Sequence, residues 1–340
     1  AVAAEHKRIA TYFLSRDLKE QGIRHLLAGE DFVGAAIVLA EKGGEWISAG
    51  ALNSVSSLAD AIPANVAEQY PRTLTHHAEV ARLRGDYETA QLLFRRAGTL
   101  LQESDDREGE AETLHSLATL ARRDGDYTQA FEYLDRALKL TEDRAIRMKC
   151  ANTRGLCLVS LGDWTAAEFE FRSALQLAQE QNDERYARLI THNLGLPAMM
   201  RGDFGEALRW LRRMLREDSQ LPMPQEATAY LNIAHCHLYL GDLSACEHHL
   251  DRAIERCQMF NLVAARAVAF ETYGNLYRER SEIEKANEYY QRAAKAYDEA
   301  SVNVARTELL EEQALLSLAI GDAQAARTQI EKLIEARPVA

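Results

Sequence analysis

Along this chain, apolar residues recur every three or four positions in paired stretches, and each pair is joined by a two-residue turn. That spacing predicts amphipathic helices, so each pair predicts a helical hairpin. Glycine tolerates the left-handed conformation that ends a helix, and aspartate can cap the helix that follows. The hairpin returns every 37 to 40 residues, which indicates a solenoid of stacked hairpins. The seven turns are Gly85-Asp86, Gly125-Asp126, Gly162-Asp163, Gly202-Asp203, Gly241-Asp242, Ser281-Glu282 and Gly321-Asp322.

Residue size also repeats at fixed distances from the first turn residue. Seven residues before the turn, the chain has Ala78, Ala118, Gly155, Gly195, Ala234, Gly274 and Ala314. Five residues after it stand Ala90, Ala130, Ala167, Ala207, Cys246, Ala286 and Ala326. Nine residues after it stand the larger Phe94, Leu134, Phe171, Leu211, Leu250 and Tyr290. Small residues let helices approach closely and large ones fill the gaps between them. The pattern therefore predicts an all-α fold, a right-handed superhelix (α-solenoid) of helical hairpins without strands.

Residues 1–65 follow a looser version of the same plan. The stretch "HLLAGEDFVGAAIVLAEKG" predicts a hairpin with one residue added to its turn, at Gly29-Glu30-Asp31. The stretch "EWISAGALNSVSSLADAIP" predicts a second helix pair, broken near Gly50 and stopped by Pro63. We therefore expect a helical arm of leading hairpins over residues 1–65 and seven repeats of about 40 residues over 66–340.

The spacing of small and large residues over 66–340 resembles the tetratricopeptide repeat. That repeat has a small residue in its first helix, an aromatic just after the turn and alanines in its second helix. The units here are longer than the usual repeat of about 34 residues, which predicts longer helices. The resemblance implies a surface that binds a partner, with no catalytic chemistry.

The leading segment adds a second resemblance. "HKRIATYFLSRDLKEQGIRHLLAGEDFVGAA", "SLADAIP" and "YPRTLTHHAEVARLRGDYETAQLLFRRA" are similar to the region after the ATPase module in MalT-like, LuxR-type transcription regulators of the STAND class. That resemblance implies a superhelical sensor domain, with ATPase and DNA-binding modules outside this chain. No GxxxxGK[ST] and no helix-turn-helix occurs here, so neither ATP nor DNA binding is implied for the chain.

The composition limits the kinds of partner and the cellular compartment that we expect for this chain. The net charge is −12 and basic residues are scattered, which argues against direct binding of nucleic acid. The five cysteines are an odd, scattered set, so we expect a reducing cytoplasm. No apolar run approaches the roughly 18 residues of a membrane span, so we expect no membrane contact, and the opening "AVAAEHKRIATYF" shows no charged leader followed by an apolar core.

No motif for catalysis or phosphate binding is present, so we expect no enzyme activity and no cofactor. The stretch "IAHCHLYLGDLSACEHHL" gathers His235, Cys236, His237, Cys246 and the pair His248-His249. Imidazole and thiolate groups on facing helices would suit a transition metal. Cys246, however, stands at a small packing position and adjacent histidines diverge on a helix. We therefore predict no metal site.

Two proline-containing stretches interrupt the helical pattern. Pro197 and Met199-Met200 in "NLGLPAMMRGDF" predict a bend with an adaptable apolar surface, which is either a binding pocket or a tolerated kink. "SQLPMPQ", residues 219–225, predicts a turn between repeats, with Pro222 and Pro224 stopping the helix.

Function is expected on the first helices of the repeats, whose residues ten, six and three before each turn should face the concave side. A groove of mixed apolar and polar character suits a small ligand or a peptide, although for any one of these residues a plain solvated helix surface is the favoured interpretation, since exposed polar residues are the norm. The main hypothesis is a sensor domain of a multidomain transcription regulator that binds a small-molecule inducer or a regulatory protein. The alternative is a constitutive interaction scaffold that binds a peptide, and a peptide-pheromone receptor would fall between the two. The predicted site residues are Arg122, Asn152, His192, Met199, Asn232, His235, Glu271, Asn275 and Arg278.

Overall fold

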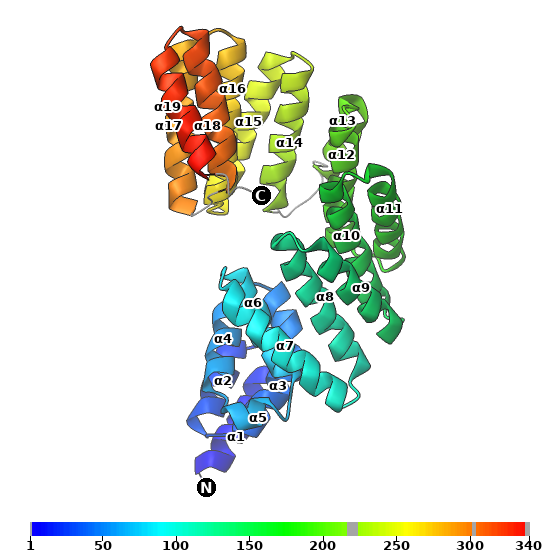
Figure 1. Ribbon diagram of the computed structural model, residues 1–340. Coiled ribbons are helices and arrows are strands. Elements are labelled where there is room, and N and C mark those ends of the chain that lie inside the picture. The colour runs from blue at the N-terminus through cyan, green and yellow to red at the C-terminus, as the bar shows by residue number, and fades with distance from the viewer. Residues whose placement is uncertain (1, 216–223, 301–303, 337–340) are drawn as a thin grey trace. The chain divides into compact units, whose positions relative to one another are not determined.

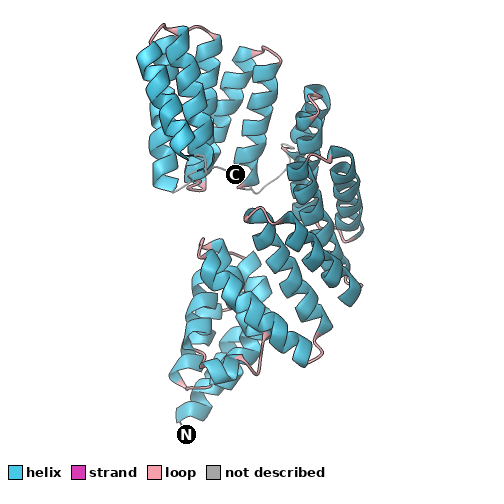
Figure 2. Cartoon of the chain, viewed as in Figure 1, coloured by secondary structure: helices cyan, strands magenta, loops and turns pink. Residues whose placement is uncertain are grey.

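The structure is a computed structural model, and it describes residues 2–215, 224–300 and 304–336 of the 340-residue chain. Within these ranges the regular secondary structure is α-helical throughout, and the helices are joined by short loops and turns (Figure 2). The prediction of an all-α solenoid of helical hairpins is therefore confirmed. No helix in the described ranges combines the length and the apolar character that crossing a lipid bilayer requires.

The helices fall into two compact units, Ala1–Leu161 and Gly162–Ala340, which we call the N-terminal unit and the C-terminal unit. In each unit, consecutive helices run antiparallel (Figure 1). The N-terminal unit contains α1 (Val2–Leu14), α2 (Lys19–Ala28), α3 (Phe32–Ser48), α4 (Leu52–Ala61), α5 (Ala64–Ala67), α6 (Arg72–Leu83), α7 (Tyr87–Glu103), α8 (Arg107–Arg123), α9 (Tyr127–Leu140) and α10 (Arg144–Leu161). The C-terminal unit contains α11 (Trp164–Glu180), α12 (Glu184–Met200), α13 (Phe204–Met214), α14 (Gln225–Tyr239), α15 (Leu243–Met259), α16 (Val263–Glu279), α17 (Ile283–Ala300), α18 (Val304–Ala319) and α19 (Ala323–Ala336).

Each predicted turn separates two helices, which we call the A helix before the turn and the B helix after it. The six turn glycines all adopt positive φ, between 77° and 84°, and at the one turn without a glycine Ser281 does so with φ 61°. The following aspartate caps the B helix, as Asp86 accepts from the backbone N–H of Thr89 at 3.2 Å and Asp242 from that of Ala245 at 3.0 Å. The chemistry predicted for the turns is confirmed.

The core lies between the helices of each hairpin and its neighbours. The small residues of the pattern are fully buried, for example Ala78 before a turn and Ala90 after it. The large residue nine after the turn is also fully buried, as Phe94 and Tyr290 show. Close packing of this kind explains why the size pattern is kept from copy to copy, because a larger side chain has no space to enter.

The leading hairpins differ from the repeats in the position of the left-handed residue. At the first of these turns Glu30 has φ 51°, whereas Gly29 has φ −89°, because the added residue shifts the left-handed position by one. Asp31 then caps α3 by accepting from the backbone N–H of Gly34 at 2.9 Å. The break at Gly50 (φ 81°) and the end of α4 before Pro63 agree with the sequence. The domain boundary at residue 65 stays a prediction.

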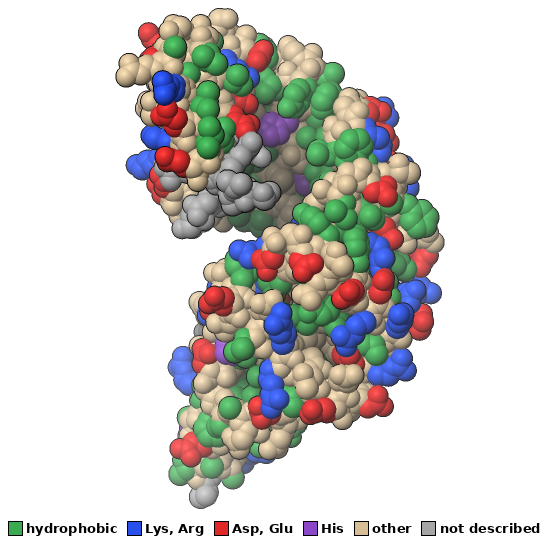
Figure 3. Space-filling view, viewed as in Figure 1, with side chains coloured by type: hydrophobic (Ala, Val, Ile, Leu, Met, Phe, Trp, Pro, Cys, Tyr) green, Lys and Arg blue, Asp and Glu red, His purple; other side chains and the backbone are tan. Residues whose placement is uncertain are grey.

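The connection between α13 and α14 carries the second proline-containing stretch. Residues 219–223, including Pro222, lie outside the described residues, and Pro224 is the residue that precedes α14. Pro197 lies inside α12, is buried, and is followed by the half-buried Met199. Elsewhere on the surface, Lys and Arg side chains are interspersed with Asp and Glu on the face shown in Figure 3.

Candidate partner-binding surface

Successive A helices pack directly against each other, with contacts between α6, α8 and α10 in the N-terminal unit and between α12, α14, α16 and α18 in the C-terminal unit. Side chains on their facing flanks can therefore hydrogen-bond from one repeat to the next. The residue nine before the turn is polar in every repeat, a signal that the sequence analysis did not use. These residues are His76, Ser116, Thr153, Asn193, Asn232, Thr272 and Glu312.

His192 of α12 links two A helices in the C-terminal unit. Its Nε2 lies 3.1 Å from Nδ2 of Asn232 on α14, and its Nδ1 lies 3.1 Å from Oδ1 of Asn193. A neutral imidazole with its proton on Nδ1 satisfies both bonds, because it donates to the Asn193 carbonyl and accepts from the Asn232 amide. Burial lowers the pKa of His192, which favours this neutral form.

His235 makes the next link, from α14 to α16. Its Nε2 lies 2.7 Å from Oγ1 of Thr272, and the Thr272 hydroxyl donates its single proton to the backbone carbonyl of Val268 at 2.8 Å. His235 must therefore carry its proton on Nε2 and donate to the hydroxyl. Burial lowers the pKa of His235 as well, so this imidazole also stays neutral.

The predicted site residues on α16 are bonded to the helices that follow. Glu271 accepts from the hydroxyl of Tyr297 at 2.5 Å, and Asn275 accepts from the hydroxyl of Tyr290 at 2.6 Å. Arg278 pairs with Glu312 of α18. These three residues therefore serve packing between helices, whether or not they also contact a partner.

The N-terminal unit has the same kind of link between A helices. Thr75 and Thr113 are joined through their hydroxyl groups at 3.0 Å, and His115 Nε2 lies 3.1 Å from the hydroxyl of Thr153. Burial and then the nearby Lys149 lower the pKa of His115 to about 3. A row of neutral hydrogen bonds thus runs across the A helices of each unit.

Two predicted site residues of the N-terminal unit lie beside this row. Arg122 is half-buried, and its Nε has no hydrogen-bond partner among the described residues. Asn152 is buried, with only 8% of its surface exposed to solvent.

The residues ten before the turn were expected on the open side of the A helices, and for three of them that expectation is wrong. Thr75, Asn152 and His192 are all less than a tenth exposed. They are buried because the adjacent A helix covers that flank. Met199, Asn232 and His235 remain half-buried, and among the residues that the structure describes, the carbonyl oxygen and one amide proton of Asn232 have no hydrogen-bond partner. That these residues contact a partner stays a prediction.

The cluster of histidines and cysteines in α14 and α15 packs as core. Burial raises the pKa of Cys236 to about 11 and that of Cys246 to about 12, so both are thiols and poor ligands. His237 stacks on His249 with ring centroids 5.5 Å apart, while His248 points to solvent. In the part of the chain that the structure describes, no three His, Cys, Asp or Glu side chains come together as a metal site would require.

Helical hairpins of this kind occur in known protein families. Family models described as tetratricopeptide repeat match residues 69–143 and 227–258. These two segments are tetratricopeptide repeats. The residues matched include the A helices α6, α8 and α14 that carry the row of hydrogen bonds. No curated protein sequence matches the chain significantly.

Solved structures with a similar fold include Rap proteins and a phosphatase. A Rap protein complexed with Competence and Sporulation Factor has a TM-score of 0.71 at 14% identity, over 98% of this chain and 97% of that one. Aspartyl phosphate phosphatase F from Bacillus subtilis has 0.66 at 13% identity, over 100% and 94%. The Rap conjugation gene regulator of plasmid pLS20 in complex with the Phr* peptide has 0.63 at 16% identity, over 78% and 73%. At these identities the similarity establishes the fold.

Proposed function

We propose that this chain is a non-catalytic tetratricopeptide scaffold that binds a peptide segment along the A helices of its C-terminal unit. The observation that carries the proposal is the state of Asn232 and His235, which lie one helical turn apart on α14. Each forms a hydrogen bond to a neighbouring A helix, and each is half-buried. Toward the described residues, Asn232 has a donor and an acceptor left over and Nδ1 of His235 is an acceptor, so this strip matches the donors and acceptors of a peptide backbone.

The surroundings of this strip support a peptide more than a charged small ligand. The histidines are neutral, and half-buried Leu196, Met199 and Leu238 flank them on α12 and α14. Neutral hydrogen-bonding groups between apolar side chains suit main-chain amides with apolar side chains beside them. The similar structure of a conjugation gene regulator in complex with the Phr* peptide points in the same direction. Five buried, free cysteines support the proposed cytoplasmic location.

A peptide-library selection tests the proposal. A library of random linear peptides would be panned against the full chain, and selected sequences would be synthesised and titrated by fluorescence polarisation. We expect saturable binding that weakens at least about tenfold in Asn232→Ala, because a buried hydrogen bond to the ligand is lost. Lys332→Ala, an exposed cation on α19, is the control and should bind normally.

The folded state of each variant is checked by its circular dichroism spectrum, because Asn232 also bonds to His192. Asn232→Leu keeps the approximate size of the side chain but removes its donor and acceptor, so a loss of binding equal to that of Asn232→Ala would separate a direct polar contact from a loss of packing. Peptides that bind the Asn232→Ala variant as tightly as the original chain would place the site elsewhere and reject the proposal.

We also propose a finer assignment, in which the chain is the effector-binding part of a MalT-like multidomain transcription regulator. What supports it is the similarity of "HKRIATYFLSRDLKEQG" and the following segments to the arm of those regulators. In that case a small-molecule inducer or a regulatory protein would occupy the A-helix surface, and ligand binding would select one conformation of the repeats. The ATPase and DNA-binding modules would lie outside this chain.

The complete reading frame tests this assignment. A GxxxxGK[ST] segment encoded upstream and a helix-turn-helix encoded downstream would support it. A frame without either motif would contradict it and leave the peptide-binding scaffold as the proposed function.

A further inference from the structure

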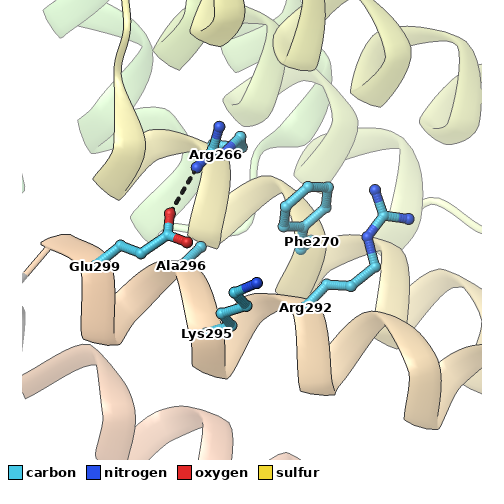
Figure 4. A pocket seen from close by; sticks show the side chains of 6 residues that line it. All are labelled: Arg266, Phe270, Arg292, Lys295, Ala296 and Glu299. Carbon is cyan, nitrogen blue, oxygen red and sulfur yellow. Dashed lines mark hydrogen bonds and ion pairs between the residues drawn. The ribbon is translucent and has the colours of Figure 1, made fainter.

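A small surface pocket lies between α16 and α17, at the end of the hairpin away from its turn. Its volume is about 220 Å³, and α16 supplies two side chains while α17 supplies four (Figure 4). The lining residues are Arg266, Phe270, Arg292, Lys295, Ala296 and Glu299. Three cations therefore surround one pocket in a chain whose net charge is −12. This concentration of positive charge stands out against the mixed surface elsewhere.

Only one of the three cations is neutralised by a carboxylate. Arg266 donates through Nη2 to Glu299 at 2.9 Å, whereas its Nε is buried and has no hydrogen-bond partner among the described residues. Arg292 and Lys295 form no ion pair with any described residue. Arg292 instead lies over the rings of Phe270 and Tyr289, with its guanidinium carbon 4.2 Å and 4.7 Å from the ring centroids.

The stacking on two rings fixes where the Arg292 guanidinium lies. Aromatic stacking uses the face of a guanidinium and leaves its N–H groups at the edge available to a ligand. The pocket therefore combines two cations without carboxylate partners and a buried, unpartnered donor of Arg266. Ala296 contributes only a methyl group at the base, so space remains for a group larger than water.

This pocket is separate from the proposed peptide surface. Phe270 and Asn275 are five residues apart on α16, which places them about 140° apart around the helix axis. Asn275 faces Tyr290, whereas Phe270 faces Arg292 and Tyr289. A ligand in the pocket would leave the strip around Asn232 and His235 free.

We propose that this pocket is a second binding site, which takes the phosphate group of a phosphate monoester. A phosphate carries up to two negative charges and several oxygens, so it can accept from more than one of the pocket's cations. A carboxylate carries a single charge and would satisfy fewer of these donors. Phosphate monoesters occur both in small metabolites and in phosphorylated side chains, and the pocket recognises the group that they share.

Calorimetric titration of the full chain with inorganic phosphate tests the site, at constant ionic strength and pH 7.5. We expect saturable binding, with acetate binding more weakly. The double variant Arg292→Gln/Lys295→Gln should weaken phosphate binding at least about tenfold, because it removes charge-assisted hydrogen bonds. Titrations with glycerol phosphate and with a phosphoserine-containing pentapeptide then identify the source, since the preferred ester should bind more tightly than inorganic phosphate.

A matched control separates the site from the overall charge of the chain. Arg209→Gln/Lys332→Gln removes two exposed cations of the same unit outside the pocket and should bind phosphate normally. Glu299→Gln should tighten binding up to about fivefold, because it removes a carboxylate that competes for Arg266.

Two outcomes would overturn the proposal. One is an equal loss of affinity in the control and the pocket variant, and the other is an absence of saturable phosphate binding in the original chain. Asn232→Ala should keep phosphate binding unchanged, so the peptide-binding proposal and this one can fail independently.

Discussion

The protonation state of several histidines in these helices depends on burial against the adjacent repeat. His192, His235 and His115 each bond to a residue of an adjacent A helix, and burial lowers the pKa of all three. Neutral imidazoles suit such places because they carry a donor and an acceptor without the cost of burying a charge. The same residues that join the repeats therefore make the fold sensitive to acid.

We expect stability to fall as pH falls below about 6.5. Burial, with His237 beside it, lowers the pKa of His249 to about 4, while an unfolded histidine titrates near 6.5. Between these values the unfolded chain binds more protons, so the folded state loses stability as pH drops from about 6.5 towards 4. His249→Phe keeps a ring to stack on His237 and should reduce the drop in melting temperature between pH 7.5 and 5.5. Identical pH profiles for the original chain and the variant would contradict this account.

A glycine of the repeat pattern gives a steric prediction. A Cβ at Gly274 would lie 2.3 Å from Cε1 of Tyr290, whereas one at Gly98 would meet Cγ2 of Thr113 at 3.8 Å, an ordinary contact. Gly274→Ala should therefore cost about 1–3 kcal/mol of unfolding free energy through overpacking. Gly98→Ala lies inside α7 and should be neutral or stabilising by up to about 1 kcal/mol, because alanine favours helix. Urea denaturation of both variants measures the difference, and equal stabilities would mean that Tyr290 moves aside without cost.

At the scale of elements, the repeats are joined by the A-helix hydrogen bonds and by buried ion pairs near the helix ends. Glu226 at the start of α14 accepts from Arg188 of α12 at 2.9 Å and from Arg256 of α15 at 2.9 Å. The side chains of all three residues are less than a fifth exposed. One carboxylate therefore links α14 both to α12 of the preceding hairpin and to α15, its partner helix within the same hairpin.

Removing this carboxylate should destabilise the C-terminal unit strongly. Glu226→Gln keeps the shape but removes the buried carboxylate that Arg188 and Arg256 share, which should cost about 3 kcal/mol. Glu255→Gln is the matched control, because Glu255 also pairs with Arg256 but is half exposed, and its loss should cost at most about 1 kcal/mol. Chemical denaturation followed by circular dichroism measures both, and equal effects of the two variants would contradict a special role for the shared carboxylate.

At the scale of the whole molecule, each helix packs mainly against its neighbours in sequence. Stability then comes from each repeat and its contacts with the next, so a long chain needs no single large core. The net charge of −12 also belongs to the whole chain, because it acts at a distance on any charged partner.

The chain should not bind duplex DNA at physiological salt. Binding to DNA depends on basic residues that displace counterions from the phosphates, and this chain carries 40 basic and 52 acidic residues. Electrophoretic mobility of a mixed-sequence duplex should be unchanged with a large excess of the protein. A shift that persists at about 150 mM salt would contradict the expectation.

The hairpins, their turns and their packing positions follow from local patterns in the sequence. Glycine at positive φ, a capping aspartate and small residues at fixed spacing act within one or two helical turns, so Gly85, Asp86 and Ala90 could be interpreted without knowing any distant contact. The register of the seven repeats follows from the same local rules. These parts of the fold agree with what the sequence predicted.

Which polar side chains are exposed depends on contacts between helices that are far apart in sequence. His192 looks like an open position in the sequence, but Asn232, which is 40 residues away, bonds to it and the packed helices bury it. The pocket between α16 and α17 likewise depends on side chains from both helices, among them Arg266 and Lys295. Hydrogen bonds and ion pairs form over about 3 Å, so they depend on the exact approach of helices that the spacing of residues along one helix does not specify.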